Sequence, residues 1–156
     1  LKYQLIINNY MQLKKILIIS TGNSVRSQMA EGWMRYYTGK HAEIYSAGSE
    51  ENRGINKLAH HVMMESVIDI GAQTSDRIDR YLDQTFEHVM LLDKQAEVAL
   101  TQINYNHQHI YEIEDPLIFK TDKNLMVQKF IEVRNQLDDL SFNFVNQFIR
   151  NLIPPL

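Results

Sequence analysis

The chain has 156 residues, which suits one domain with a single hydrophobic core. Hydrophobic residues make up 44% and charged residues 22%, and a net charge of -3 gives no reason to expect nucleic acid or a membrane surface as a partner. Cysteine is absent, which excludes disulfides, thiolate metal sites and thiol catalysis in the chain as given.

The first ten residues differ from the rest of the chain. The chain begins with Leu1, and Lys2 precedes only a short apolar patch, whereas a signal peptide has a longer apolar core. Met11 would be a natural start just before the first predicted strand. We therefore interpret residues 1–10 as an N-terminal extension and 11–156 as a single domain. No segment reaches the roughly 20 apolar residues that cross a bilayer, so we expect a cytoplasmic protein.

Apolar runs alternate with helical spacing along the chain. Four consecutive apolar residues at 16–19 predict a strand that is buried on both faces, as in a parallel sheet. Further strands are predicted at 42–47, 86–92 and 109–113, and helices at 29–37, 55–63, before 82, at 94–103 and from 124 to about 149. This alternation predicts a three-layer α/β fold with a four-stranded parallel sheet and helices on both faces. In such folds ligands bind at the carboxyl ends of the strands.

The polar loop Ser-Thr-Gly-Asn-Ser-Val-Arg-Ser, residues 20–27, joins the first strand to the first helix. Such a loop directs several backbone N–H groups at one point, at the positive end of a helix dipole, and this favours a tetrahedral oxyanion. Arg26 follows Ser20 by six positions, so a curled loop brings the guanidinium to the same oxyanion. Taken alone, the same residues also fit a capped helix start.

Residues 20–33, Ser-Thr-Gly-Asn-Ser-Val-Arg-Ser-Gln-Met-Ala-Glu-Gly-Trp, resemble the phosphate-binding loop of thioredoxin-coupled arsenate reductases. These enzymes belong to the low-molecular-weight protein tyrosine phosphatase superfamily. The resemblance continues through 45–48, 68–70, 74–76 and the Asp-Pro pair at 115–116 to the helix at 130–137. Thr21, Ser24 and Gln28 favour the arsenate reductase branch, whereas Asp93 resembles the aspartate that ordinary phosphatases carry at that strand end.

The resemblance implies a role for particular residues. Ser20 stands at the position of the nucleophile, Arg26 at that of the loop arginine and Asp115 at that of the general acid. The implied oxyanion-binding residues are Ser20, Thr21, Gly22, Asn23, Ser24, Val25, Arg26 and Ser27. An oxygen-rich set matches positions that in some family members support a potassium ion, and it comprises Asn23, Glu31, Ser46, Thr74 and Asp76.

The sulfur chemistry of the family is missing. Ser20 replaces the nucleophilic cysteine, Val25 replaces a second one, and no cysteine is present near 92–93 or 99–100. An anion-binding loop lowers a thiol pKa from about 8.5 to roughly 3.5–7.5, whereas a serine hydroxyl starts far higher and needs an adjacent base. We therefore expect no arsenate reduction by the family mechanism, no thioredoxin partner and no required cofactor.

Three hypotheses remain open at the level of sequence. The chain is a catalytically silent homologue that binds phosphate, arsenate or sulfate, or it is a phosphatase or arsenate reductase represented by a Cys-to-Ser variant at Ser20. The third hypothesis is a non-catalytic protein-interaction module that has kept only the fold.

Overall fold

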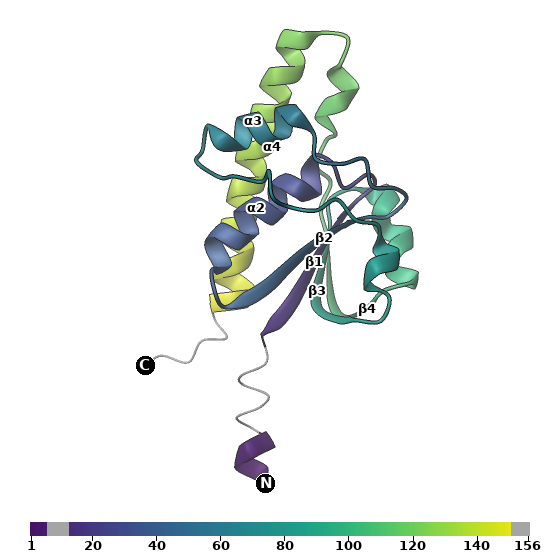
Figure 1. Ribbon diagram of the computed structural model, residues 1–156, viewed down its shortest axis with the longest axis vertical. Coiled ribbons are helices and arrows are strands. Elements are labelled where there is room, and N and C mark those ends of the chain that lie inside the picture. The colour runs from purple at the N-terminus through teal and green to yellow at the C-terminus, as the bar shows by residue number, and fades with distance from the viewer. Residues whose placement is uncertain (6–12, 151–156) are drawn as a thin grey trace.

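The computed structural model describes residues 1–5 and 13–150 (Figure 1). Residues 2–5 form one helical turn. The predicted boundary between extension and domain, at residues 10 and 11, lies outside the described residues, so that division stays a prediction. Among the described helices, none is long and apolar enough to cross a membrane.

A four-stranded parallel sheet forms the centre of the molecule. Its strands lie in the order β2 (Ala42–Gly48), β1 (Lys14–Ser20), β3 (Thr85–Leu91) and β4 (Asn104–Ile110). In the pairing of β1 with β2, Ser20 is opposite Gly48, so both strands end at the same edge. The predicted parallel α/β fold is confirmed, and the carboxyl ends of the strands meet at one edge of the sheet.

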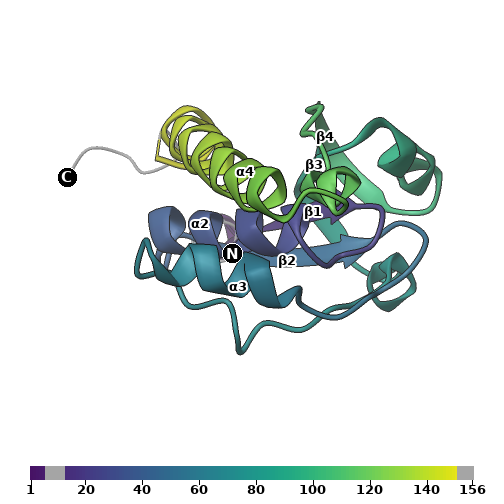
Figure 2. The ribbon, with the colours of Figure 1, turned by 90° about the horizontal axis from the view of Figure 1, so that it is seen from above.

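Both faces of the sheet are covered, because the central strand is apolar on both sides. Ile16 and Ile18 belong to a core with the three α-helices, whereas Leu17 and Ile19 belong to a second core on the opposite face. Figure 2 shows α2 between α3 and α4 on the first face. The second face carries 3-10 helices, which are wound more tightly than the α-helices on the first face.

Some helix ends lie at a residue that suits a cap. The helix α2 (Arg26–Thr38) ends at Gly39, whose φ of 53° is the left-handed conformation that favours glycine. The Asn56 side chain accepts two backbone hydrogen bonds at the start of α3 (Lys57–Met64). The other helices are η1 (Ile78–Tyr81), η2 (Lys94–Thr101), η3 (Pro116–Phe119), α4 (Lys123–Phe144) and the π-helix η4 (Val145–Ile149).

The fourth strand differs from the prediction. The sequence favoured a strand at 109–113, but β4 spans Asn104–Ile110 and overlaps that range at only two residues. Among the described strands this edge strand pairs only with β3, and all of its side chains are exposed or half-exposed. It therefore carries no apolar run, and pairing with the neighbouring strand decides its position.

Candidate functional site

The loop of residues 20–27 lies at the carboxyl edge of the sheet, between β1 and α2. Asn23 has a φ of 44°, a conformation that asparagine tolerates better than most residues. The segment after β2 holds the loop through backbone hydrogen bonds: the N–H groups of Ser49, Arg53 and Asn56 donate to carbonyls of the loop. The predicted loop is thus braced from outside by the segment that follows β2.

Two serines meet at the base of the loop. Ser20 is 2% exposed, and its Oγ lies 2.6 Å from Oγ of Ser27 at the first turn of α2. Asn23 Nδ2 donates to the same Ser27 oxygen at 2.9 Å. Among the described residues no histidine or carboxylate is hydrogen-bonded to the Ser20 hydroxyl. The position that carries the nucleophile in the family therefore holds a buried hydroxyl without a base.

Arg26 begins α2, and its guanidinium faces two carboxylates. Its NH2 group lies 3.1 Å from an oxygen of Asp93 and 3.6 Å from an oxygen of Asp115. Its NH1 group donates to the carbonyl of Ile113 at 2.9 Å. The guanidinium is thus held at the loop by acceptors from the two segments that come after β3 and β4.

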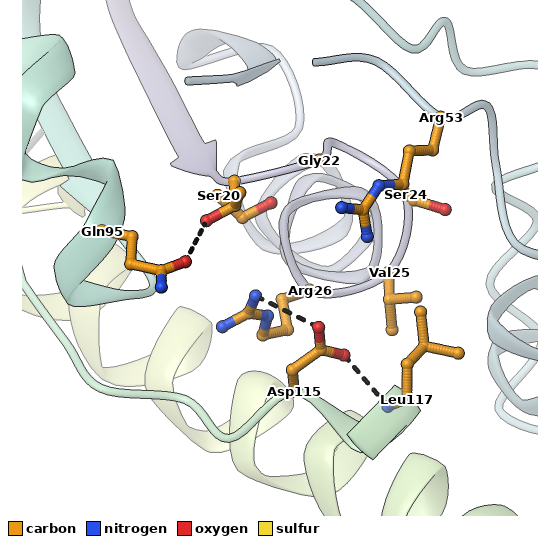
Figure 3. A pocket seen from close by; sticks show the side chains of 10 residues that line it. Ser20, Gly22, Ser24, Val25, Arg26, Arg53, Gln95, Asp115 and Leu117 are labelled. Carbon is orange, nitrogen blue, oxygen red and sulfur yellow. Dashed lines mark hydrogen bonds and ion pairs between the residues drawn. The ribbon is translucent and has the colours of Figure 1, made fainter. Parts of the chain in front are cut away.

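A cavity of about 120 Å³ opens in front of the loop (Figure 3). Ser20, Arg26 and Asp115, the three residues with an implied catalytic role, all line it. The Asp115 carboxylate also accepts from the N–H of Leu117 at 3.0 Å, which fixes it at the start of η3. Among the eight predicted loop residues, Asn23 and Ser27 do not line this cavity, because their side chains are buried beneath the loop.

Three further residues that the sequence did not indicate line the cavity, namely Leu117 and the two polar residues Arg53 and Gln95. The Arg53 side chain approaches the loop at Gly22, and Figure 3 shows its guanidinium at the cavity. Gln95 lines the opposite side, and its side chain accepts a long hydrogen bond of 3.5 Å from the Thr21 hydroxyl. Neither residue belongs to a motif, and both come from segments that only the fold brings to the loop.

The predicted potassium set is brought together as a hydrogen-bonded brace. Asn23 Nδ2 donates to the Ser46 hydroxyl at 2.8 Å, and that hydroxyl donates to Glu31 at 2.5 Å. The N–H of Asp76 donates to Asn23 Oδ1 at 2.8 Å, and the Thr74 hydroxyl donates to the Asp76 carboxylate at 2.6 Å. The five residues thus connect the loop, α2, β2 and the segment before η1.

Arginine side chains already neutralise the carboxylates of this brace. Arg35 lies 2.7 Å from Glu31, and Arg80 lies 2.7 Å from Asp76. Burial raises the pKa of Asp76, but hydrogen bonds from Thr74 and Arg80 outweigh it and hold that pKa below its usual value. The described residues contain no group of three or more His, Cys, Asp or Glu that could hold a metal. The two arginines take up carboxylate oxygens of the predicted potassium set, and the potassium ion stays a prediction.

Comparisons with known proteins agree with this architecture. Residues 15–152 match the model of the family described as low molecular weight phosphotyrosine protein phosphatase. An arsenate reductase from Halalkalibacterium halodurans is 49% identical over 107 residues, which cover 68% of this chain and 76% of the relative. One from Oceanobacillus iheyensis is 36% identical over 131 residues, which cover 83% and 93%.

A solved structure described as an arsenate reductase in the phosphate-binding state superposes with a TM-score of 0.69. It shares 27% sequence identity, and the match covers 86% of this chain and 98% of that one. The match to the family model spans nearly the whole chain, and the parallel sheet and the loop are consistent with it, whereas the chain has no cysteine. The chain therefore belongs to the low-molecular-weight phosphatase and arsenate reductase superfamily, and it lacks the cysteines of that superfamily.

Proposed function

We propose that the chain binds a tetrahedral oxyanion (phosphate, arsenate or sulfate) in the loop of residues 20–27 and does not transform it. The observation that carries this proposal is the position of Arg26. Its guanidinium lines a small cavity together with Ser20 and Thr21, at the N-terminus of a helix of 13 residues. Guanidinium groups and helix N-termini both favour anions. The similarity to a reductase described in a phosphate-binding state supports the same ligand class.

The proposed catalytic silence rests on the serine. In the part of the chain that the structure describes, the Ser20 hydroxyl has only the hydroxyl of Ser27 as a side-chain partner, and the chain has no cysteine for a redox relay. A hydroxyl without a base is a weak nucleophile at neutral pH. The cytoplasmic location and the absence of a thioredoxin partner stay predictions that accompany this proposal.

Titration calorimetry with phosphate and arsenate tests the binding. We expect dissociation constants between about 1 μM and 1 mM, a range of roughly -8 to -4 kcal/mol. Arg26→Ala should abolish binding, because it removes the only guanidinium held by Asp93 and Asp115 among the described residues. Arg150→Ala, at the exposed end of η4, is the matched control and should bind as the parent chain does. Undiminished binding by Arg26→Ala would refute the assignment of the loop.

Restoring the nucleophile tests the silence. Ser20→Cys should hydrolyse an aryl phosphate with Asp115 as the acid, whereas the parent chain should show no turnover. Adding Asp115→Asn should remove that activity. Thioredoxin-coupled arsenate reduction should stay absent in every variant, since the relay cysteines are missing. Turnover by the parent chain would contradict the proposal.

The two alternatives have their own tests. A cysteine codon for residue 20 in the source gene would favour the hypothesis of a Cys-to-Ser variant of an active phosphatase or reductase. If no oxyanion binds to the parent chain, the protein-interaction module becomes the better hypothesis.

A further inference from the structure

The Asp93 carboxylate lies at the end of β3 and is surrounded by donors. It accepts from the N–H of Thr21 at 3.0 Å, from the Thr21 hydroxyl at 3.1 Å and from the N–H of Ala96 at 2.8 Å. It also lies 3.1 Å from the Arg26 guanidinium. Its side chain is only 12% exposed. Four donor contacts on one carboxylate exceed what the cap of the short helix η2 requires.

Two of these donors are the ones that an oxyanion in the loop would use. The N–H of Thr21 is the first backbone donor after Ser20, and the Arg26 guanidinium is the charge of the loop. Charged and backbone donors of this kind form the strongest contacts to an anion. Asp93 therefore makes, from within the chain, contacts of the kind that a bound oxyanion makes.

The charges around the Arg26 guanidinium are a second reason to compare Asp93 with a bound oxyanion. Arg26 contributes one positive charge, and both Asp93 and Asp115 contribute a negative one within 3.6 Å of it. An arriving oxyanion thus meets an arginine that already has two carboxylate partners. An oxyanion bound to the same guanidinium would lie close to both carboxylates, and like charges a few ångströms apart repel one another appreciably at a protein surface, so the repulsion matters for affinity.

We propose that Asp93 is an internal anion that competes with the oxyanion for Arg26 and Thr21 and so holds the affinity of the loop down. This inference rests on the proposed oxyanion binding and adds a residue that limits it. Asp93 does not line the cavity, so it acts on the ligand through the two donors and through its charge.

Asp93→Asn tests the proposal because it removes the charge, keeps an oxygen for the Thr21 hydroxyl and the Ala96 N–H, and removes the oxygen that the Thr21 N–H and the Arg26 guanidinium contact. Sulfate is the probe, since its two charges make the competition large and do not change near neutral pH. The variant should bind sulfate at least about tenfold more tightly than the parent chain. Asp83→Asn is the matched control: it removes the same charge from an exposed residue just before β3, at the opposite edge of the sheet, and should leave the affinity unchanged.

The direction of the change separates competition from a structural role. A residue that only positions the loop would weaken binding when it is replaced, so equal or weaker sulfate binding by a folded Asp93→Asn variant overturns the proposal. If this variant does not fold, NMR on the parent chain decides. Sulfate should then shift the Asp93 carboxyl carbon and the Thr21 amide with one dissociation constant, and a stationary carboxyl signal beside shifting loop amides overturns the proposal.

The outcome also separates this inference from the proposed function. Binding only by Asp93→Asn supports the internal anion and refutes oxyanion binding by the parent chain. Binding by the parent chain with no gain in the variant refutes the internal anion alone. The absence of sulfate binding in both refutes both.

Discussion

Replacing Asn23 with alanine removes the side chain that joins the loop to the rest of the site. Asn23 is fully buried, and its amide donates to Ser27 and Ser46 and accepts from Gln28 and from the N–H of Asp76. Ser27, Ser46 and Gln28 each keep another hydrogen bond in this variant. Among the described residues only the Asp76 N–H is then left without a partner.

The energetic cost can be worked out from these contacts. Leaving the partly buried N–H of Asp76 unsatisfied costs about 1–3 kcal/mol, and the lost bonds to the other three partners add roughly 0.5–1.5 kcal/mol each before the site relaxes. Alanine at a φ of 44° adds roughly 1–2 kcal/mol, because its Cβ disfavours the left-handed region. Together these contributions come to roughly 3.5–9.5 kcal/mol, and relaxation of the site favours the lower end. We expect Asn23→Ala to lower the free energy of unfolding by about 3.5–5 kcal/mol, a large part of the roughly 5–15 kcal/mol that domains have.

Urea denaturation followed by circular dichroism measures the change, and a second variant divides it. Asn23→Gly loses the same hydrogen bonds but tolerates the positive φ, so it should be about 1 kcal/mol more stable than Asn23→Ala. A loss below about 1 kcal/mol for Asn23→Ala would show that the hydrogen bonds of Asn23 contribute little and would refute the reasoning. An alanine variant more stable than the glycine variant would contradict the assigned backbone strain.

Gly48→Ala should prevent folding or lower the melting temperature by well over 10 °C, because an added Cβ would lie 1.7 Å from the Glu51 carbonyl oxygen. Gly39→Ala is its control and should cost only about 1 kcal/mol, since no atom lies within 4 Å of its Cβ and only the φ is strained. Burial and the neighbouring His109 lower the pKa of His88 to about 4, below the unfolded value of about 6.5. The stability due to neutral His88 is therefore present above pH 6.5 and is lost as the pH falls toward 4, by up to about 3 kcal/mol. Urea midpoints between pH 7 and pH 4.5 should fall less in His88→Leu than in the parent chain, and equal slopes would contradict the burial of an uncharged histidine.

Some features could be predicted because they depend on residues close together in the chain. The apolar run at 16–19 was enough to predict a strand buried on both faces, and Gly39 was enough to end α2. The order of polar residues from Ser20 to Ser27 was enough to locate the loop between strand and helix. In each case the residues that carry the pattern are the residues that form the structure, so no distant contact is needed to predict it.

Other features could not be predicted because they depend on residues far apart. The edge strand β4 has no apolar run, so its register became visible only through its pairing with β3. Arg53 reaches the cavity because its N–H binds the carbonyl of Gly22, across a distance in sequence that no motif spans.

Some features of the loop of residues 20–27 were determined by the sequence, and others were determined by the tertiary structure. The sequence determined its residue types, its position before a helix and the loss of the cysteine at Ser20. Only the tertiary structure decided which groups meet it. Asp93, 72 residues from Thr21, holds the donors of the loop, and Arg35 and Arg80 neutralise the carboxylates of the brace. The reason is physical: composition and spacing fix which charges the chain carries, whereas their partners are set by how the strands and helices pack.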